Sequence, residues 1–283
     1  MEDMFKRLRD QREAWAKQAT TGERFSVPRE KGDVDVLIYR PENPADGKLP
    51  VLFNMHGGAW VGGDAVLMES FCRLLANEIP CVVVNVNYKK ADIHPYPYPV
   101  VEVADAVEYF IAHADEYDID VNRIAVGGHS AGGNIAAGAA LMLKERGVTL
   151  ACQMLVYPCT DLYRQGELSD ILKIYLPGGA TTERFASPLF ASDAALENVC
   201  PAIFIECGLD TLRAQGIAYA KRLINVGVPV KVKEYKKALH GFLEVCRSDY
   251  DQSDPRITPE QTKYCRDCEQ YLIRELRAYF EEA

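Results

Sequence analysis

Short runs rich in β-branched residues alternate along the chain with longer amphipathic stretches. This alternation is typical of a mostly parallel sheet with helices on both faces. The expected strands lie at 34–40, 51–55, 81–87, 123–127, 152–157, 201–207 and 229–235, with a further one near 24–28. The expected helices lie at 2–18, 66–78, 99–116, 133–146, 212–226 and 259–281. The sequence therefore predicts an α/β fold with a central sheet of about eight strands.

Three segments depart from this alternation. Residues 41–50 carry Pro, Asn, Asp and Gly in quick succession, which favours a hairpin between the first strands. Residues 158–188 show only weak helical patterning, and 1–20 form one charged helix. We expect both as elements of a small cap above the strand ends, although 158–188 is equally compatible with an irregular surface loop. Without internal repeats or a low-complexity linker, residues 1–283 are interpreted as one domain.

A serine pentapeptide stands between one expected strand and the helix that follows it. Residues 128–132 read Gly-His-Ser-Ala-Gly, the Gly-x-Ser-x-Gly pattern. A serine at such a hinge is held in a strained turn, and its hydroxyl projects above the edge of the sheet. The glycines are needed because a β-carbon would strike the neighbouring strand or helix. Ser130 is therefore the candidate nucleophile.

A nucleophilic serine needs a base, and the base needs a carboxylate that orients it. His240 is the only histidine after Ser130, and it follows the last expected strand. Asp210 follows the preceding strand, so both side chains are expected at the carboxyl edge of the sheet. Two other carboxylates compete for the role. Glu206 is expected inside a strand and too deep, whereas Asp161 follows the strand after the nucleophile; we favour Asp210.

A tetrahedral oxyanion requires backbone N–H groups that point at one spot. Residues 56–60, His-Gly-Gly-Ala-Trp, follow the second main strand in a loop where glycines let the backbone approach a substrate. The amides of Gly58 and Ala59, with Gly57 as a further candidate, are expected to form an oxyanion hole together with that of Ala131. The histidine of this segment is expected to anchor the loop rather than to act as a second base.

Aromatic residues near these segments are candidates for the substrate pocket. They are Trp60, Tyr96, Tyr163 and Tyr175. The indole can wall an acyl pocket, and the tyrosines can stack on an aromatic leaving group. Packing of the loops and of the cap explains the same residues equally well, so both interpretations stay open.

Composition excludes several classes of partner. A formal net charge of −9 leaves no basic field to attract phosphates, so neither nucleic acid nor an anionic membrane surface is expected. No apolar run approaches the roughly 20 residues of a membrane helix, and the first twenty residues lack a secretory pattern. Nine scattered cysteines favour reduced thiols in a cytoplasmic protein. Cys265 and Cys268 resemble half of a metal site without a second pair, so no metal is expected.

The motifs together resemble one protein family. His-Gly-Gly-Ala-Trp at 56–60, Gly-His-Ser-Ala-Gly-Gly at 128–133, Gly-Leu-Asp-Thr-Leu-Arg at 208–213 and Leu-His-Gly-Phe at 239–242 resemble, in this order, the hormone-sensitive-lipase-like branch of the α/β hydrolases. The resemblance implies an α/β-hydrolase fold and a carboxylesterase without a cofactor. It also implies Ser130 as nucleophile, His240 as base and Asp210 as acid. Ala59 departs from the third glycine of the family motif, which a backbone donor tolerates.

The leading hypothesis is a serine carboxylesterase that acts on a small-molecule ester through an acyl-enzyme. Because the expected cap is sparse, acetyl to butyryl groups are favoured over longer chains. An arylformamidase or another amide hydrolase is the alternative, since 56–60 also resembles the arylformamidase loop. A non-catalytic small-molecule receptor on the same scaffold is a third. Lys231 and Lys233 in the last strand either guard an open sheet edge or flank a dimer contact, so a homodimer is possible.

Overall fold

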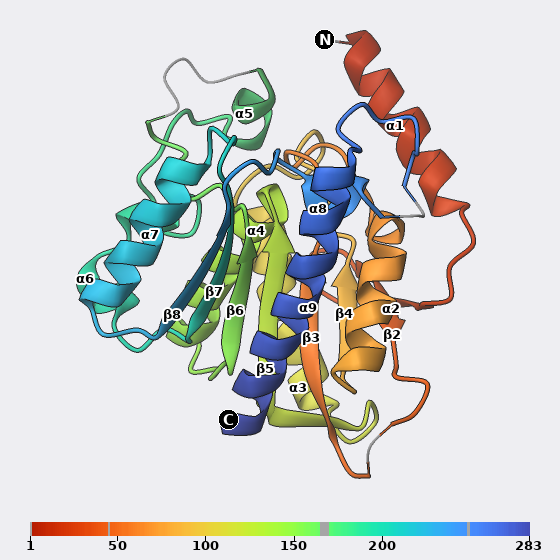
Figure 1. Cartoon of the computed structure of the whole chain (residues 1–283), viewed down its shortest axis with the longest axis vertical. Helices are drawn as coiled ribbons and strands as arrows, with labels where there is room; N and C mark the ends of the chain where they lie inside the picture. Colours follow the sequence, from red (N-terminus) through yellow and green to blue (C-terminus); the bar gives the residue numbers. More distant parts are fainter. Residues whose placement is uncertain (1, 45, 165–169, 248–249) are drawn as a thin grey trace.

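The structure is a computed structural model that describes residues 2–44, 46–164, 170–247 and 250–283. These residues form one eight-stranded sheet with the spatial order β1-β2-β4-β3-β5-β6-β7-β8 (Figure 1). The strands are β1 (Glu23–Val27), β2 (Val34–Tyr39), β3 (Leu49–Met55), β4 (Val82–Val86), β5 (Ile119–His129), β6 (Cys152–Val156), β7 (Ala202–Cys207) and β8 (Val230–Tyr235). The α/β fold and its eight strands are as predicted.

Strand pairing is parallel over most of the sheet. β1 pairs with β2 and β2 with β4 in antiparallel register, and every other neighbouring pair is parallel. The carboxyl ends of β3, β5, β6, β7 and β8 therefore meet at one edge, where loops can bring distant residues together.

The predicted hairpin across 41–50 is wrong. β2 pairs with β1 and β4, and β4 separates it from β3, so the chain crosses from one strand to the other without pairing them. The turn residues in this segment reverse the chain, but they cannot show which strand becomes the neighbour. Residue 45 of this segment lies outside the described residues.

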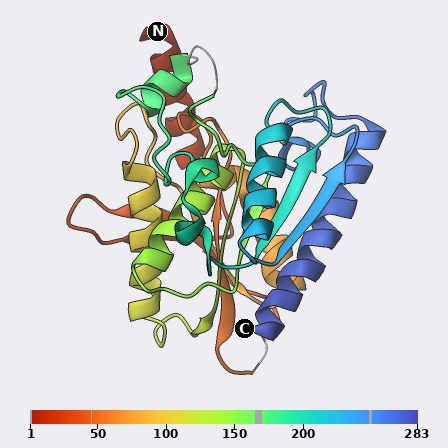
Figure 2. The ribbon, with the colours of Figure 1, turned by 90° about the vertical axis from the view of Figure 1, so that its left-hand side faces the viewer.

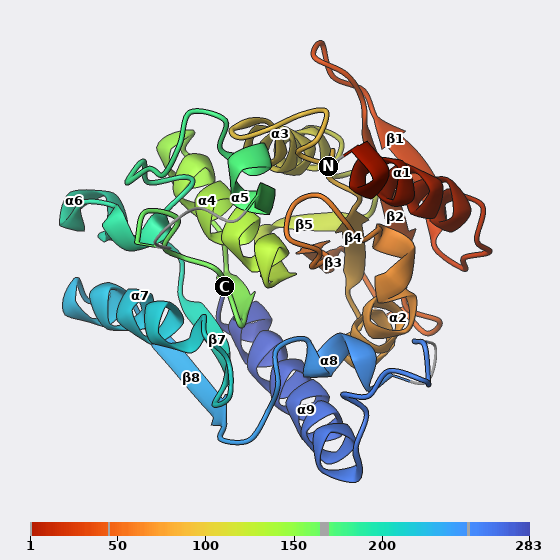
Figure 3. The ribbon, with the colours of Figure 1, turned by 90° about the horizontal axis from the view of Figure 1, so that it is seen from above.

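Helices cover both faces of the sheet (Figure 3). One apolar core joins one face to α3 (Tyr98–Ala112), α4 (Ala131–Glu145) and α7 (Arg213–Asn225). A second joins the opposite face to α2 (Glu69–Glu78) and α9 (Pro259–Glu282). The short helices are α5 (Asp170–Tyr175), α6 (Asp193–Leu196) and α8 (Phe242–Val245), with 3₁₀ turns at Ala65–Met68 and Pro188–Phe190. Figure 2 shows the same layers from the side.

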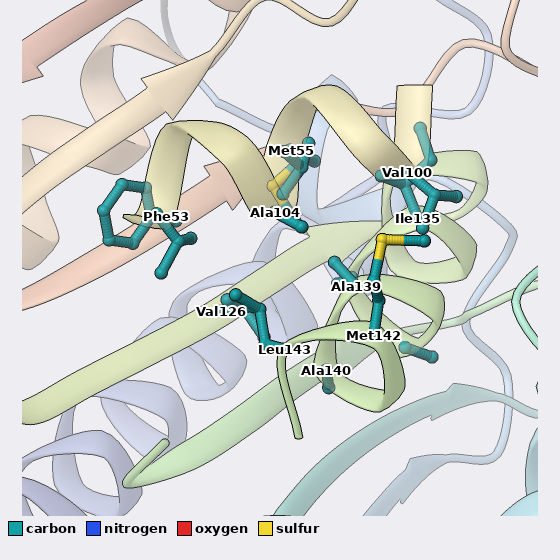
Figure 4. Close-up of a cluster of buried hydrophobic side chains, with 14 of the residues drawn as sticks. Phe53, Met55, Val100, Ala104, Val126, Ile135, Ala139, Ala140, Met142 and Leu143 are labelled. Carbon is teal, nitrogen blue, oxygen red and sulfur yellow. The ribbon is translucent and has the colours of Figure 1, made fainter. Parts of the chain in front are cut away.

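The first core is built where strand and helix side chains interdigitate. Phe53 of β3 and Val126 of β5 are fully buried. Ile135 of α4, together with Val100 and Ala104 of α3, is buried in the same cluster (Figure 4). Burial of such side chains stabilises the fold by about 1.5–3 kcal/mol each, which anchors the start of α4 against the sheet.

Among the elements whose lengths differ from their sequence patterns, β5 and α3 have structural explanations. β5 spans eleven residues rather than five, because Ile119 pairs with Leu49 beyond an irregularity in the ladder. α3 ends at Ala112 rather than at 116, since the chain turns back so that the Leu49 amide can bond the carbonyl of Asp118, whose φ is +53°.

The segments expected as a cap lie beside the carboxyl edge of the sheet. α1 (Glu2–Ala16) is held by an ion pair between Arg12 and Asp92, which follows β4. α5 lies against the same loop, where the Tyr96 amide donates to the carbonyl of Tyr175. Residues 165–169 of the expected cap lie outside the described residues.

All nine cysteines are free and eight of them are buried, Cys265 and Cys268 included. Within the described ranges, no helix has the length and apolarity to cross a membrane. The same ranges contain no group of three or more His, Cys, Asp or Glu residues arranged to hold a metal ion.

Candidate active site

Ser130 occupies the turn between β5 and α4. Its φ of +55° and ψ of −113° lie in a region that non-glycine residues rarely adopt, and such strain is typical of functional sites. Its amide donates to the carbonyl of Val156 at 2.9 Å, which ties the turn to β6. A β-carbon on Gly132 would lie 2.3 Å from the Met55 carbonyl oxygen, so glycine there lets α4 begin directly against the end of β3. The turn thus presents the hydroxyl at the sheet edge.

His240 and Asp210 meet this hydroxyl from the loops after β8 and β7. The distance from Ser130 Oγ to His240 Nε2 is 2.8 Å, and that from His240 Nδ1 to Asp210 Oδ2 is 2.5 Å. The Asp210 side chain is only 3% exposed, whereas that of His240 is 38% exposed and open to the cavity. The other carboxylate oxygen of Asp210 accepts from the Leu212 amide at 2.9 Å, which fixes its orientation. The structure brings the three predicted residues into one hydrogen-bonded line.

The two competing carboxylates are engaged elsewhere. Glu206 lies inside β7, and burial raises its pKa to about 8, aided by the nearby charge of Asp210. Asp161 accepts hydrogen bonds from the amides of Tyr163 and Arg164, in a turn after β6. Asp210 is the carboxylate that bonds the imidazole.

The glycine loop after β3 faces the serine across a cavity. Gly57, Gly58 and Ala59 line this cavity together with Ser130. Within the described part of the chain, no group accepts a hydrogen bond from the amides of these three loop residues or from that of Ala131. The loop takes left-handed dihedrals at Gly58 (φ +131°), where glycine is required, and also at Ala59 (φ +51°), where alanine costs about 1–2 kcal/mol. The four predicted amides are therefore available to an oxyanion.

The cavity has a volume of about 390 Å³ and a mixed lining. Its apolar wall comes from α1, from the 3₁₀ turn before α2 and from α8. Charged groups also line the cavity, on α8 and on the segment before α9. The contributing side chains are Trp15, Leu67, Met68, Val245, Tyr250, Glu244 and Arg256.

None of the four aromatic residues expected in the pocket lines this cavity. Trp60 is buried, stacks on Tyr175 with ring centroids 4.5 Å apart, and donates from its indole nitrogen to Asn134. Tyr96 packs edge-on against the same Tyr175 ring, and Tyr163 is exposed against Phe190. Trp60 and Tyr96 therefore pack against Tyr175 of α5, whereas Tyr163 stays at the surface.

Glu244 is a site residue that the sequence analysis missed. Its carboxylate accepts from the Tyr157 hydroxyl and lies 3.1 Å from Nδ1 of His129, the residue before the serine. Burial would raise the pKa of Glu244, but the facing His129 ring, the Tyr157 hydroxyl and the nearby His240 outweigh it, and the pKa falls to about 2. Its position in the sequence, only four residues after His240, is the signal that could have revealed it.

The lowered pKa of Glu244 predicts that acid destabilises the fold. A carboxyl group whose pKa falls from 4.5 to about 2 on folding contributes about 3 kcal/mol above pH 4.5, and this contribution is lost as the pH falls through 2. The free energy of unfolding of the wild type should therefore decline more steeply from pH 5 to pH 2 than that of Glu244→Gln, as measured by urea denaturation. Exposed Glu116→Gln is the control and should follow the wild type. Equal slopes for wild type and Glu244→Gln would refute the prediction.

Comparison with known proteins identifies the family. The family profile of the α/β hydrolase fold matches residues 52–244, more than half of the chain. The chain belongs to the α/β-hydrolase family. The matched region of this α/β hydrolase includes Ser130, Asp210, His240 and the glycine loop.

Relatives of this α/β hydrolase include named esterases. It is 32% identical over 236 residues to an arylesterase of Saccharolobus solfataricus, covering 77% of this chain and 76% of the relative. It is 31% identical over 229 residues to the carboxylesterase NlhH of Mycobacterium tuberculosis, covering 75% and 72%. Among solved structures, an esterase of Pyrobaculum calidifontis superposes with a TM-score of 0.77 at 27% identity, covering 98% of this chain and 92% of that one.

Proposed function

We propose that this α/β hydrolase is a serine carboxylesterase that hydrolyses short-chain esters through an acyl-enzyme. The observation that carries the proposal is the line from Ser130 Oγ through the His240 ring to the Asp210 carboxylate, at 2.8 and 2.5 Å. It lies beside loop amides that have no acceptor among the described residues. The esterase names of the relatives support the same reaction class.

The geometry supports an acyl-transfer mechanism. Ser130 Oγ attacks the ester carbonyl carbon while His240 Nε2 takes its proton, and Asp210 stabilises the resulting imidazolium. The carbonyl oxygen becomes an oxyanion held by the amides of Gly58, Ala59 and Ala131. Its collapse breaks the bond to the alcohol, which receives the proton from the imidazolium. Water, deprotonated by His240, then attacks the acyl-enzyme, and the carboxylic acid leaves as Ser130 regains its proton.

The lining of the cavity supports short acyl groups. Glu244 and Arg256 add charged groups to the lining, so a long chain would not find apolar surface throughout the cavity. Each methylene that stays in contact with water forgoes up to about 0.8 kcal/mol of binding free energy. Lengthening the acyl chain beyond butyryl should therefore add little binding free energy in the transition state.

An ester series tests the proposed substrate class. We expect kcat/KM for p-nitrophenyl esters to be highest from acetyl to butyryl and to fall toward decanoyl. A formanilide assayed beside the acetate measures the amide alternative, and we expect its kcat/KM to be lower. A maximum at octanoyl or longer would contradict the acyl preference, whereas faster turnover of the formanilide would contradict the esterase.

A further inference from the structure

The loop after β4 packs against the glycine loop and hydrogen-bonds to it. The rings of Tyr88 and His56 stack with centroids 4.3 Å apart, and the Tyr88 hydroxyl donates to the His56 carbonyl at 3.1 Å. Three residues on, the Ala91 amide donates to the carbonyl of Trp60 at 2.9 Å. Both ends of the 56–60 segment are thus held by the same loop.

Lys90 lies at the centre of this support and is only 6% exposed. Its Nζ lies 2.6 Å from the Tyr88 carbonyl oxygen, 2.9 Å from Asn87 Oδ1 and 3.0 Å from His56 Nε2. An ammonium group has three N–H donors and no acceptor. Three acceptors at hydrogen-bond distance therefore match the charged form of Lys90, donor for acceptor.

The contacts of the His56 ring with Gly57 and Lys90 agree on one tautomer. Nδ1 of His56 lies 2.6 Å from the carbonyl oxygen of Gly57, which can only accept, so Nδ1 carries the proton. In a neutral ring Nε2 is then the acceptor, as the Lys90 ammonium requires. Burial, and next the Lys90 charge, hold the pKa of His56 well below its usual range, so the ring is neutral.

The carbonyl that His56 holds belongs to the peptide that joins Gly57 to Gly58. In a planar trans peptide the C=O and N–H bonds point in opposite directions. Fixing the Gly57 oxygen therefore fixes the direction of the Gly58 N–H. Because glycine rotates easily, this peptide would otherwise be free to flip.

We propose that Lys90 is a positioning residue of the oxyanion hole: acting through His56, its ammonium group holds the Gly57–Gly58 peptide so that the Gly58 N–H faces the oxyanion. This inference rests on the proposed esterase function, because the Gly58 N–H affects the rate of hydrolysis only if an oxyanion forms beside it.

The charge on Lys90 depends on pH. Burial lowers its pKa to about 7; Asp64 and Glu102 oppose this, whereas Arg12 and Lys89 add to it. Lys90 is thus charged below pH 7 and neutral well above it. A neutral amine has two N–H donors for the three acceptors, so the support weakens as the pH rises.

Lys90→Met tests the inference, because it keeps an unbranched side chain, one atom shorter, and removes all donors. We expect kcat for p-nitrophenyl acetate to fall about 10- to 100-fold with KM changed less than about threefold, since the loss concerns the transition state. The Ki of a trifluoromethyl ketone, which forms a tetrahedral adduct with a serine, should rise by the same factor as kcat/KM falls. The ratio of wild-type to variant kcat should be larger at pH 6 than at pH 9.

Lys89→Met is the matched control. Lys89 is the adjacent lysine, and its ammonium pairs with Asp35 at 3.0 Å, away from His56. The Lys89→Met variant should keep kcat and Ki within about twofold of the wild-type values. His56→Phe supplies a double-mutant cycle: if Lys90 acts through His56, Lys90→Met should cost little more in the His56→Phe background.

Several outcomes would overturn the inference. They are an unchanged kcat in Lys90→Met, a loss that appears in KM alone, an unchanged Ki, or additive losses in the double variant. If Lys90→Met does not fold, as judged by its Tm, Lys90→Gln takes its place with the same expected split between kcat and KM. A wild type that hydrolyses no ester and resists a fluorophosphonate refutes the proposed function, and the role of Lys90 falls with it; an active wild type with an unaffected Lys90→Met refutes the positioning role alone.

Discussion

Replacing Ser130 with alanine should lower kcat for p-nitrophenyl acetate by about 10⁴-fold or more. The 2.8 Å contact between Ser130 Oγ and His240 Nε2 makes this hydroxyl the one whose proton the imidazole can take. Alanine removes the attacking atom and leaves the turn, whose φ of +55° is set by the backbone. Steady-state rates and labelling by a fluorophosphonate probe measure the effect, and both should be lost together.

The control for this variant is a serine that caps a helix. Ser192 accepts from the Ala195 amide at the start of α6 and does not line the cavity. Ser192→Ala should keep full labelling and turnover while losing about 1 kcal/mol of stability. If Ser130→Ala kept more than about 1% of wild-type activity, the nucleophile would have to be another residue.

Replacing Asp210 with asparagine should lower kcat by about 10⁴-fold. The carboxylate accepts from His240 Nδ1 at 2.5 Å, and it both orients the ring and stabilises its positive charge in the transition state. An amide removes the charge, and its NH₂ group favours the wrong tautomer. The oxygen that accepts from the Leu212 amide can be kept, so the fold should survive.

Asp161→Asn tests whether Asp161, the other candidate from the sequence, acts as the acid in place of Asp210. Asp161 accepts from the amides of Tyr163 and Arg164, and an asparagine side chain can accept from them in the same way. We expect less than a tenfold loss of kcat from this variant. A larger loss for Asp161→Asn than for Asp210→Asn would reverse the assignment of the acid.

The strands and the line of site residues were predictable because they depend on local pattern and chain order. Parallel strands end at a common edge, so side chains that directly follow β7 and β8 meet the turn that follows β5. Ser130, Asp210 and His240 each stand just beyond a strand, and the structure joins them by hydrogen bonds. The order of the motifs was therefore sufficient to select them from 283 residues.

The features that the sequence analysis missed depend on contacts between distant segments. The hairpin across 41–50 was wrong because β4, from later in the chain, lies between β2 and β3. Lys90 and Glu244 look like ordinary surface residues. Only the structure shows that Lys90 is buried and that Glu244 faces the buried His129. Trp60 could wall a pocket or pack beneath a loop, and the approach of Tyr175 was needed to choose between them.

Because most cysteines are buried, their reaction with a thiol reagent can measure how often the fold opens. Eight of the nine thiols are buried and Cys246 is partly accessible, while a thiol must reach water and ionise before it reacts. A maleimide dye should thus attach first at Cys246 and enter the other eight only when the fold opens. Mass spectrometry of dye uptake over time would then report the opening rate of each layer, in variants that have lost all turnover as readily as in the wild type.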